Sequence, residues 1–126
     1  MKRFWLGFLI LTMLLAGSLL IHTALYRIHT SISADLEQAA LSALQKNWDD
    51  ALRHARTATN RWQRYHRFTA AFADHTPMDE VDGLFSQLPV HAQQREDPHF
   101  AATCNELFVL TSAIAQSHGL NWWNLL

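Results

Sequence analysis

The feature that most limits what this chain can fold into is an uninterrupted apolar stretch near its N-terminus. Residues 4–25 (FWLGFLILTMLLAGSLLIHTAL) are 22 positions without a formal charge. As a helix that rises about 1.5 Å per residue, such a stretch reaches across the roughly 30 Å of a bilayer's hydrocarbon core. Phe4, Trp5 and Tyr26 lie near its two ends, where aromatic rings favour the membrane interface. The sequence therefore predicts one transmembrane helix over residues 4–25, in contact with the lipid bilayer.

The charges that flank this stretch predict its orientation. Lys2, Arg3 and the amino terminus precede it, whereas Arg27 on the other side is followed by acidic residues. Because positive charge is retained on the cytoplasmic side, we expect residues 1–3 to be cytoplasmic. Residues 35–126 are then an extracytoplasmic helical bundle, with residues 26–34 as a linker or as a continuation of the helix. The expected location is the cell membrane, with a single pass.

A cleaved secretory signal is the alternative reading of the same segment. Lys2 and Arg3 provide the positive start of such a signal, and residues 16–18 (AGS) are small. The apolar run continues past them to Ile21, however, which is longer than the usual signal core of up to about 15 residues. We therefore expect an uncleaved signal anchor. Both readings place residues 27–126 outside the cytoplasm.

The composition of the chain predicts an all-α fold. Alanine and leucine together number 36 against 8 for valine and isoleucine, with only 4 glycines and 3 prolines. Alanine and leucine favour helices, and a sandwich or barrel needs turn residues that are scarce here. We expect the N-terminal transmembrane helix to be followed by an antiparallel three-helix hairpin bundle that contains one long heptad-patterned helix. The second helix is expected to kink or to be interrupted at Pro89, with residues 90–96 as a continuation, and the third is expected to end at Gly119.

The long helix is predicted over residues 41–72. Apolar or small side chains recur there at alternating steps of three and four residues, at Leu41, Leu44, Trp48, Ala51, Ala55, Ala58, Trp62, Tyr65, Thr69 and Phe72. This period of 3.5 predicts a seam that packs against other helices, so Trp48, Trp62 and Tyr65 are candidate packing or partner contacts. Residues 30–50 would form a stalk, whose seam is covered either by the C-terminal tail or by a second copy. The tail residues Trp122 and Trp123 are further candidates for docking on the bundle, on the membrane interface or on a partner.

Five arginines follow the same predicted helix without an intervening acid. They are Arg53, Arg56, Arg61, Arg64 and Arg67. Residues 74–97 then hold six acids and a single arginine. We expect ion pairs between these two stretches, and the alternative is a stripe that binds phosphate, anionic lipid or another anion. An extracytoplasmic location makes nucleic acid an improbable partner.

The titratable residues give no support for catalysis or for a metal. The eight histidines have no HxxxH, HxH or HExxH spacing, and Cys104 falls in an apolar stripe, where a buried inert thiol is expected. A single cysteine also excludes an internal disulfide and a c-type haem. No GxSxG motif or glycine-rich phosphate loop is present. We therefore expect a protein that is not an enzyme and has no cofactor and no metal.

The layout as a whole resembles the bacterial family catalogued as domain of unknown function 4363. The matching features are the charged start with its apolar span, Trp48 and Trp62 fourteen residues apart, the segment from His75 (HTPMDEVDGLF), and the C-terminal residues 121–126 (NWWNLL). The resemblance implies a short, single-span, membrane-anchored helical protein, and it implies no catalytic residue or cofactor. Pro89 and Pro98 depart from the family's pattern, in which the acid-rich helix runs on.

Together these observations predict a membrane-anchored, non-enzymatic helical protein that serves as a protein-interaction or accessory subunit. Its partner is expected to be a membrane or extracytoplasmic protein, or a second copy of the chain. The alternative is an extracytoplasmic sensor, or an anionic-ligand-binding helical domain that uses the arginine stripe or the histidines. An interaction module needs an exposed apolar face, whereas a sensor needs a pocket between helices lined by converging arginine or histidine side chains.

Overall fold

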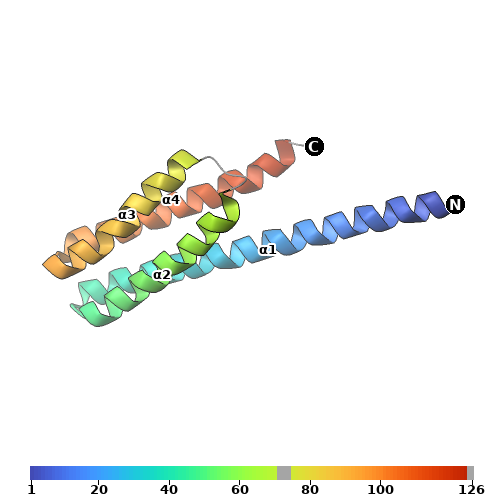
Figure 1. Ribbon diagram of the computed structural model, residues 1–126. Helices are drawn as coiled ribbons and strands as arrows, with labels where there is room; N and C mark the ends of the chain where they lie inside the picture. The colour runs from blue at the N-terminus through green and yellow to red at the C-terminus, as the bar shows by residue number, and fades with distance from the viewer. Residues whose placement is uncertain (71–74, 125–126) are drawn as a thin grey trace.

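The computed structural model describes the backbone of residues 1–70 and 75–124, and the side chains of residues 1–70 and 77–116. The described chain forms helices α1 (Lys2–Leu44), α2 (Trp48–Thr69), α3 (His75–Gln94) and α4 (Asp97–Asn124) and no strand (Figure 1). The all-α prediction is therefore confirmed.

The first helix, α1, combines the apolar stretch and one side of the bundle in a single rod of 43 residues. It is long and apolar enough to cross a membrane, and no side chain in its most apolar part is buried. From His29 onward one face turns inward at steps of three and four residues, at His29, Ile32, Leu36, Ala39 and Ala43. Residues 26–34 are thus a helix continuation rather than a flexible linker. Figure 1 shows the N-terminal part of this rod projecting well beyond the other helices.

The continuous helix predicted over residues 41–72 is wrong, because the chain reverses at residues 45–47. Lys46 adopts a φ of 61°, in the left-handed region that ends a helix. Asn47 then caps α2 through its side-chain oxygen, which accepts a hydrogen bond from the backbone N–H of Asp50. The 3.5 period continues through this turn in the sequence only, because Leu41 and Leu44 are exposed, whereas the buried face of α1 runs from His29 to Ala43. Leu41 and Leu44 belong to α1, and the seam from Ala51 to Thr69 belongs to α2.

The bundle contains four described helices rather than three, because the C-terminal half of α1 is one of them. Each helix packs on the next helix in the chain, and α4 also packs on α1. The four helices thus form a closed bundle with up-down-up-down order. Residues 30–50 are therefore not a stalk. Alanines line the α1–α2 contact and permit close approach, whereas larger side chains such as Trp62, Phe85 and Phe100 fill the middle of the core.

Of the last two helices, α3 continues past Pro89 as one of the two alternatives had it, and α4 is longer than predicted. Pro89 lies inside α3 on its exposed side. Because proline has no backbone N–H, one carbonyl of the preceding turn loses its helical hydrogen bond, but on this side it is open to water and a kink is tolerated. The helix therefore continues to Gln94. The expected end at Gly119 is wrong, because α4 continues to Asn124. Since α4 is antiparallel to α1, its C-terminal end points toward the same side as the apolar part of α1 (Figure 1).

Candidate functional site

A cleft of about 650 Å³ between α2 and α3 combines an aromatic floor with a polar wall. Trp62 and Phe85 stack there with ring centroids 6.1 Å apart. The Trp62 indole Nε1 donates a hydrogen bond of 2.6 Å to one oxygen of Asp82, and Nδ1 of His66 lies 3.0 Å from the other. Both oxygens of this carboxylate are therefore engaged by α2. Arg67, which also lines the cleft, keeps an exposed guanidinium.

A second hollow, of about 320 Å³, lies between α1 and α4 and is largely apolar. We call it the α1–α4 groove, and its lining consists of Leu36, Glu37, Ala40, Leu41, Cys104, Asn105 and Phe108. Leu41 and Phe108 flank it and are 45% and 42% exposed. Leu44 and Val109 on the same two helices are more exposed still. The bundle thus exposes an apolar surface to solvent, in addition to the surface of the apolar part of α1.

Two groups in the core are held in their neutral form by burial. The Tyr65 side chain is 1% exposed, and burial raises the pKa of its hydroxyl to about 12. Burial likewise raises the pKa of the Cys104 thiol to about 12, so this thiol is protonated and unreactive at neutral pH. Among the side chains that the structure describes, no group of three or more His, Cys, Asp or Glu residues could hold a metal ion.

The aromatic candidates from the sequence lie in different environments. Trp62 is 0% exposed and, together with Tyr65, forms the centre of the core. Trp48 is half-buried near the far end of the bundle, where its ring meets that of Phe100 edge-on at 5.5 Å. Packing is therefore the role of Trp62 and Tyr65, since neither reaches the surface. Trp122 and Trp123 belong to the last turn of α4, but their side chains lie outside the described residues.

Among the described side chains, no arginine of α2 pairs with an acid of α3, although the sequence predicted such pairs. Arg61 forms an ion pair with Asp35 of α1, and Arg53 lies 2.8 Å from Asp50 of its own helix. The carboxylate of α3 that faces α2, Asp82, is instead taken by an indole and an imidazole.

The other three arginines of α2 remain open to solvent. Arg56, Arg64 and Arg67 are exposed and form no ion pair with any described residue. Two of the five arginines thus form ion pairs with described residues, and the other three are exposed at positions where they could bind an anion.

Four residues of these contacts were not among the candidate site residues predicted from the sequence: Asp35, His54, His66 and Asp82. Asp35 lies near both His54 and Arg61, which come from a helix that the turn at residues 45–47 folds back. A prediction that carried one helix through this turn could not bring them together. Asp82 is one of the six acids that were expected to face the arginines, but the sequence did not indicate that an indole and an imidazole would bind it instead.

Comparison with known proteins agrees with the resemblance noted from the motifs. A family model described as domain of unknown function DUF4363 matches residues 19–125. The match runs from the end of the apolar stretch through all four helices. No curated protein and no solved structure matches the chain. Because the family model covers most of the 126 residues, the chain belongs to the DUF4363 family.

Proposed function

We propose that this chain is a single-pass membrane protein whose exported bundle binds a protein partner, as a non-enzymatic accessory subunit or by self-association. The support for the anchor is the apolar part of α1, where large side chains such as Phe4, Leu14 and Leu20 face outward uncovered. A water-soluble protein rarely leaves so continuous an apolar surface exposed, whereas a bilayer covers it. The positive charges of Lys2 and Arg3 favour a cytoplasmic N-terminus and an extracytoplasmic bundle.

The observation that carries partner binding is the α1–α4 groove. Its two flanking side chains, Leu41 and Phe108, come from different helices and leave a hollow between them. Such a hollow accepts apolar side chains spaced three or four residues apart on a partner's helix. Glu37 and Asn105 at its edge supply acceptors that orient the partner. The groove is thus suited to a helix of another protein, or of a second copy, that lies along α1 and α4.

Site-specific photocrosslinking in cells tests this proposal. A photoreactive amino acid replaces Leu41 or Phe108 in the full-length chain, and Gln63, exposed on α2 away from the groove, is the matched control. We expect a discrete adduct from both groove positions and none from position 63. An adduct of twice the chain's mass would identify self-association, and a heavier one an accessory role. No adduct from either groove position, or the same adducts from all three, would refute partner binding at the groove.

A second candidate function, an extracytoplasmic sensor of an anionic ligand, is favoured by the convergence of His66 and Arg67 in the α2–α3 cleft. Arg67 supplies an exposed guanidinium that suits a phosphate or carboxylate. Inorganic phosphate should then raise the thermal unfolding midpoint of the full-length chain but not that of Arg67→Gln. Equal midpoints with and without phosphate in the unmodified chain would eliminate this candidate.

A further inference from the structure

Three exposed arginines lie where the apolar part of α1 enters the bundle. Arg27 follows the end of the apolar stretch by two residues. The antiparallel register of α1 and α2 is fixed by the ion pair of Asp35 with Arg61 and by the ring contact of His29 with Tyr65 at 4.7 Å. Because the two helices run in opposite directions, a residue that follows Tyr65 in α2 lies level with the residue that precedes His29 in α1 by the same number of positions.

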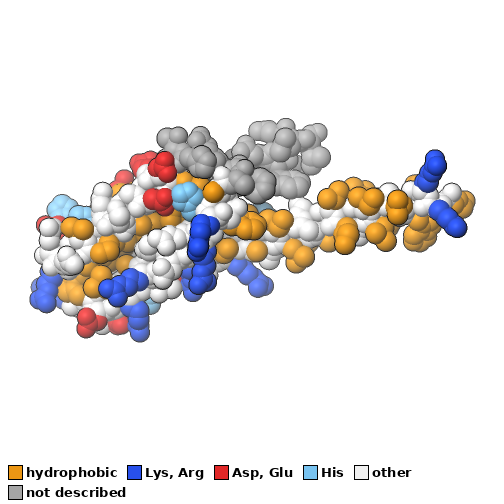
Figure 2. Space-filling view, in the orientation of Figure 1, with side chains coloured by type: hydrophobic (Ala, Val, Ile, Leu, Met, Phe, Trp, Pro, Cys, Tyr) orange, Lys and Arg blue, Asp and Glu red, His pale blue; other side chains and the backbone are white. Residues whose placement is uncertain are grey.

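This register places two arginines of α2 beside the end of the apolar stretch. Arg67 is two residues past Tyr65 and so lies level with Arg27, two residues before His29. Arg64 is level with residue 30, about 7 Å beyond residue 25 at the helical rise of 1.5 Å per residue. We call Arg27, Arg64 and Arg67 the basic collar. Figure 2 shows Lys and Arg side chains gathered at the end of the bundle from which the apolar rod protrudes.

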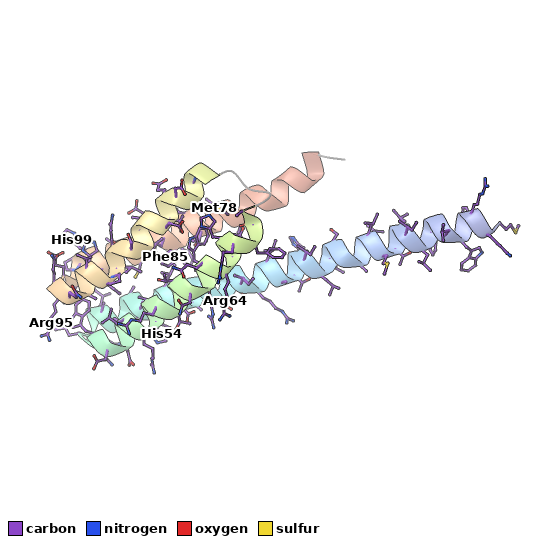
Figure 3. The ribbon with its side chains drawn as sticks, viewed as in Figure 1. His54, Arg64, Met78, Phe85, Arg95 and His99 are labelled. Atoms are coloured by element: carbon purple, nitrogen blue, oxygen red, sulfur yellow. The ribbon has the colours of Figure 1, made fainter. Side chains whose placement is uncertain are left out.

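The charges around the basic collar leave it available to an outside anion. All three side chains are exposed, and none forms an ion pair with a described residue. The exposed acids at the same end of the bundle, Asp79 and Glu80, belong to α3, which packs on α2 and α4 rather than on α1. The labelled side chain of Arg64 in Figure 3 extends from α2 on the side away from α3. Arg67 lies on the other side of α2, where it lines the α2–α3 cleft, so the three arginines share a level of the bundle rather than a single face.

We infer that the basic collar binds the phosphates of anionic lipids in the leaflet from which the bundle emerges. The inference rests on the proposed membrane anchorage of residues 4–25. With that stretch in the hydrocarbon core, the collar falls within the headgroup layer, which extends roughly 5–8 Å beyond the core on each side. Guanidinium groups pair with phosphate oxygens through two hydrogen bonds, and the exposed ring of Tyr26 suits the same layer. The depth of the collar matches the lipid headgroups, and its contacts hold this end of the bundle against the membrane.

Lipid selectivity of the full-length chain in vesicles tests this inference. The chain is reconstituted in phosphatidylcholine vesicles that contain a trace of spin-labelled phosphatidylglycerol or spin-labelled phosphatidylcholine, and the immobilised fraction of each tracer is compared. A basic residue at an anionic surface contributes roughly fivefold to the affinity. We expect the chain to prefer phosphatidylglycerol, and we expect the triple variant Arg27→Gln, Arg64→Gln, Arg67→Gln to lose at least a fivefold part of that preference. Lys2 and Arg3 at the opposite end are the same in both proteins.

The matched control removes three positive charges from the far end of the bundle. Lys46, Arg56 and Arg95 are exposed and distant from the apolar stretch, so the variant Lys46→Gln, Arg56→Gln, Arg95→Gln should keep the preference of the unmodified chain. Circular dichroism verifies that both triple variants are folded. Rising ionic strength should reduce the preference of the unmodified chain and of the control variant alike.

Three outcomes would overturn the inference. The first is an unchanged preference for phosphatidylglycerol in the collar variant, and the second is an equal loss of that preference in the control variant. The third is displacement of the lipid tracer by soluble glycerol phosphate, which would identify a site for free phosphate instead. Failure of the anchorage itself has a different signature, because the chain would then not float with vesicles of phosphatidylcholine alone. A chain that floats with them but shows no effect of the collar contradicts only the lipid contact.

Discussion

Removal of the Asp82 carboxylate should destabilise the bundle well beyond the effect of an ordinary surface substitution. The Trp62 side chain is 0% exposed, and its indole N–H is bound to Asp82 at 2.6 Å. In Asp82→Ala this donor, at the floor of the α2–α3 cleft, has lost its acceptor within the protein. An unsatisfied buried donor costs about 1–3 kcal/mol. Loss of the partly exposed contact with His66, 3.0 Å from the carboxylate, adds at most about 1 kcal/mol.

Asp82→Asn separates the hydrogen bond from the charge. The amide oxygen of Asn still accepts the indole N–H, so we expect a loss of about 1 kcal/mol rather than the 2–3 kcal/mol expected for alanine. Asp79→Ala is the matched control, because Asp79 is exposed on the same helix, and it should change the unfolding free energy by no more than about 0.5 kcal/mol.

Thermal unfolding of the full-length chain in detergent, followed by circular dichroism, measures these differences. For a domain of this size each 1 kcal/mol moves the midpoint by about 4–8 °C, so Asp82→Ala should lower it by roughly 10–20 °C. A shift in Asp82→Ala no larger than that in Asp79→Ala would refute the reasoning, since the indole would then have lost nothing.

Three further predictions follow from the packing, the ion pairs and the buried titratable groups. Ala58→Leu should destabilise the bundle by about 1–3 kcal/mol in denaturant titrations, because residue 58 is fully buried where α1 and α2 approach closely. Asp35→Ala should cost about 1–2 kcal/mol in the same assay, because the carboxylate is only 15% exposed and Arg61 loses its partner on α1. The thermal midpoint should fall as the pH rises from about 9 to 12, because burial raises the pKa of Cys104 from 9.0 and that of Tyr65 from 10.0, each to about 12. The neutral forms stabilise the folded state fully below the unfolded pKa values, and this stability is lost as the pH passes through the folded ones.

Each of these predictions has a control and an outcome that contradicts it. Asn60→Leu adds a similar side chain at an exposed position of α2 and should be nearly neutral, so an equal cost at both positions would argue against close packing. Arg53→Ala breaks an exposed pair within one helix and should cost less than about 0.5 kcal/mol. If Arg53→Ala cost as much as Asp35→Ala, the pair of Asp35 with Arg61 would contribute no more to stability than an exposed pair within one helix. For the pH effect, Tyr65→Phe should flatten the decline above pH 10, and an unchanged slope would disprove the contribution of Tyr65.

Much of the fold could be predicted because its information is local. The uncharged stretch at residues 4–25, the scarcity of turn residues and the 3.5 period each depend on near neighbours in the sequence. The turn at residues 45–47 could not be predicted from the same pattern, because Leu41 and Leu44, which are exposed on α1, continue the spacing of the buried seam of α2. Only the left-handed Lys46 and the Asn47 cap mark the reversal, and neither residue is a glycine or a proline.

The candidate site was less predictable because it depends on this reversal. The pairing of Arg61 with Asp35 and the α1–α4 groove both require the second half of α1 to lie inside the bundle. Two local signals of low helix propensity were also outweighed, since α3 continues through Pro89 and α4 continues past Gly119. Tertiary packing supplies the energy that a single proline or glycine costs, and that energy cannot be read from a short window of sequence.

Alkaline carbonate extraction of membranes, followed by the intact mass of the retained chain, tests the central claim most directly. We expect the chain to stay with the membrane and its mass still to include residues 1–25, since these residues form one continuous helix with the first part of the bundle. A chain released by carbonate, or one whose mass lacks these residues, would contradict the claim that α1 anchors the bundle in the bilayer.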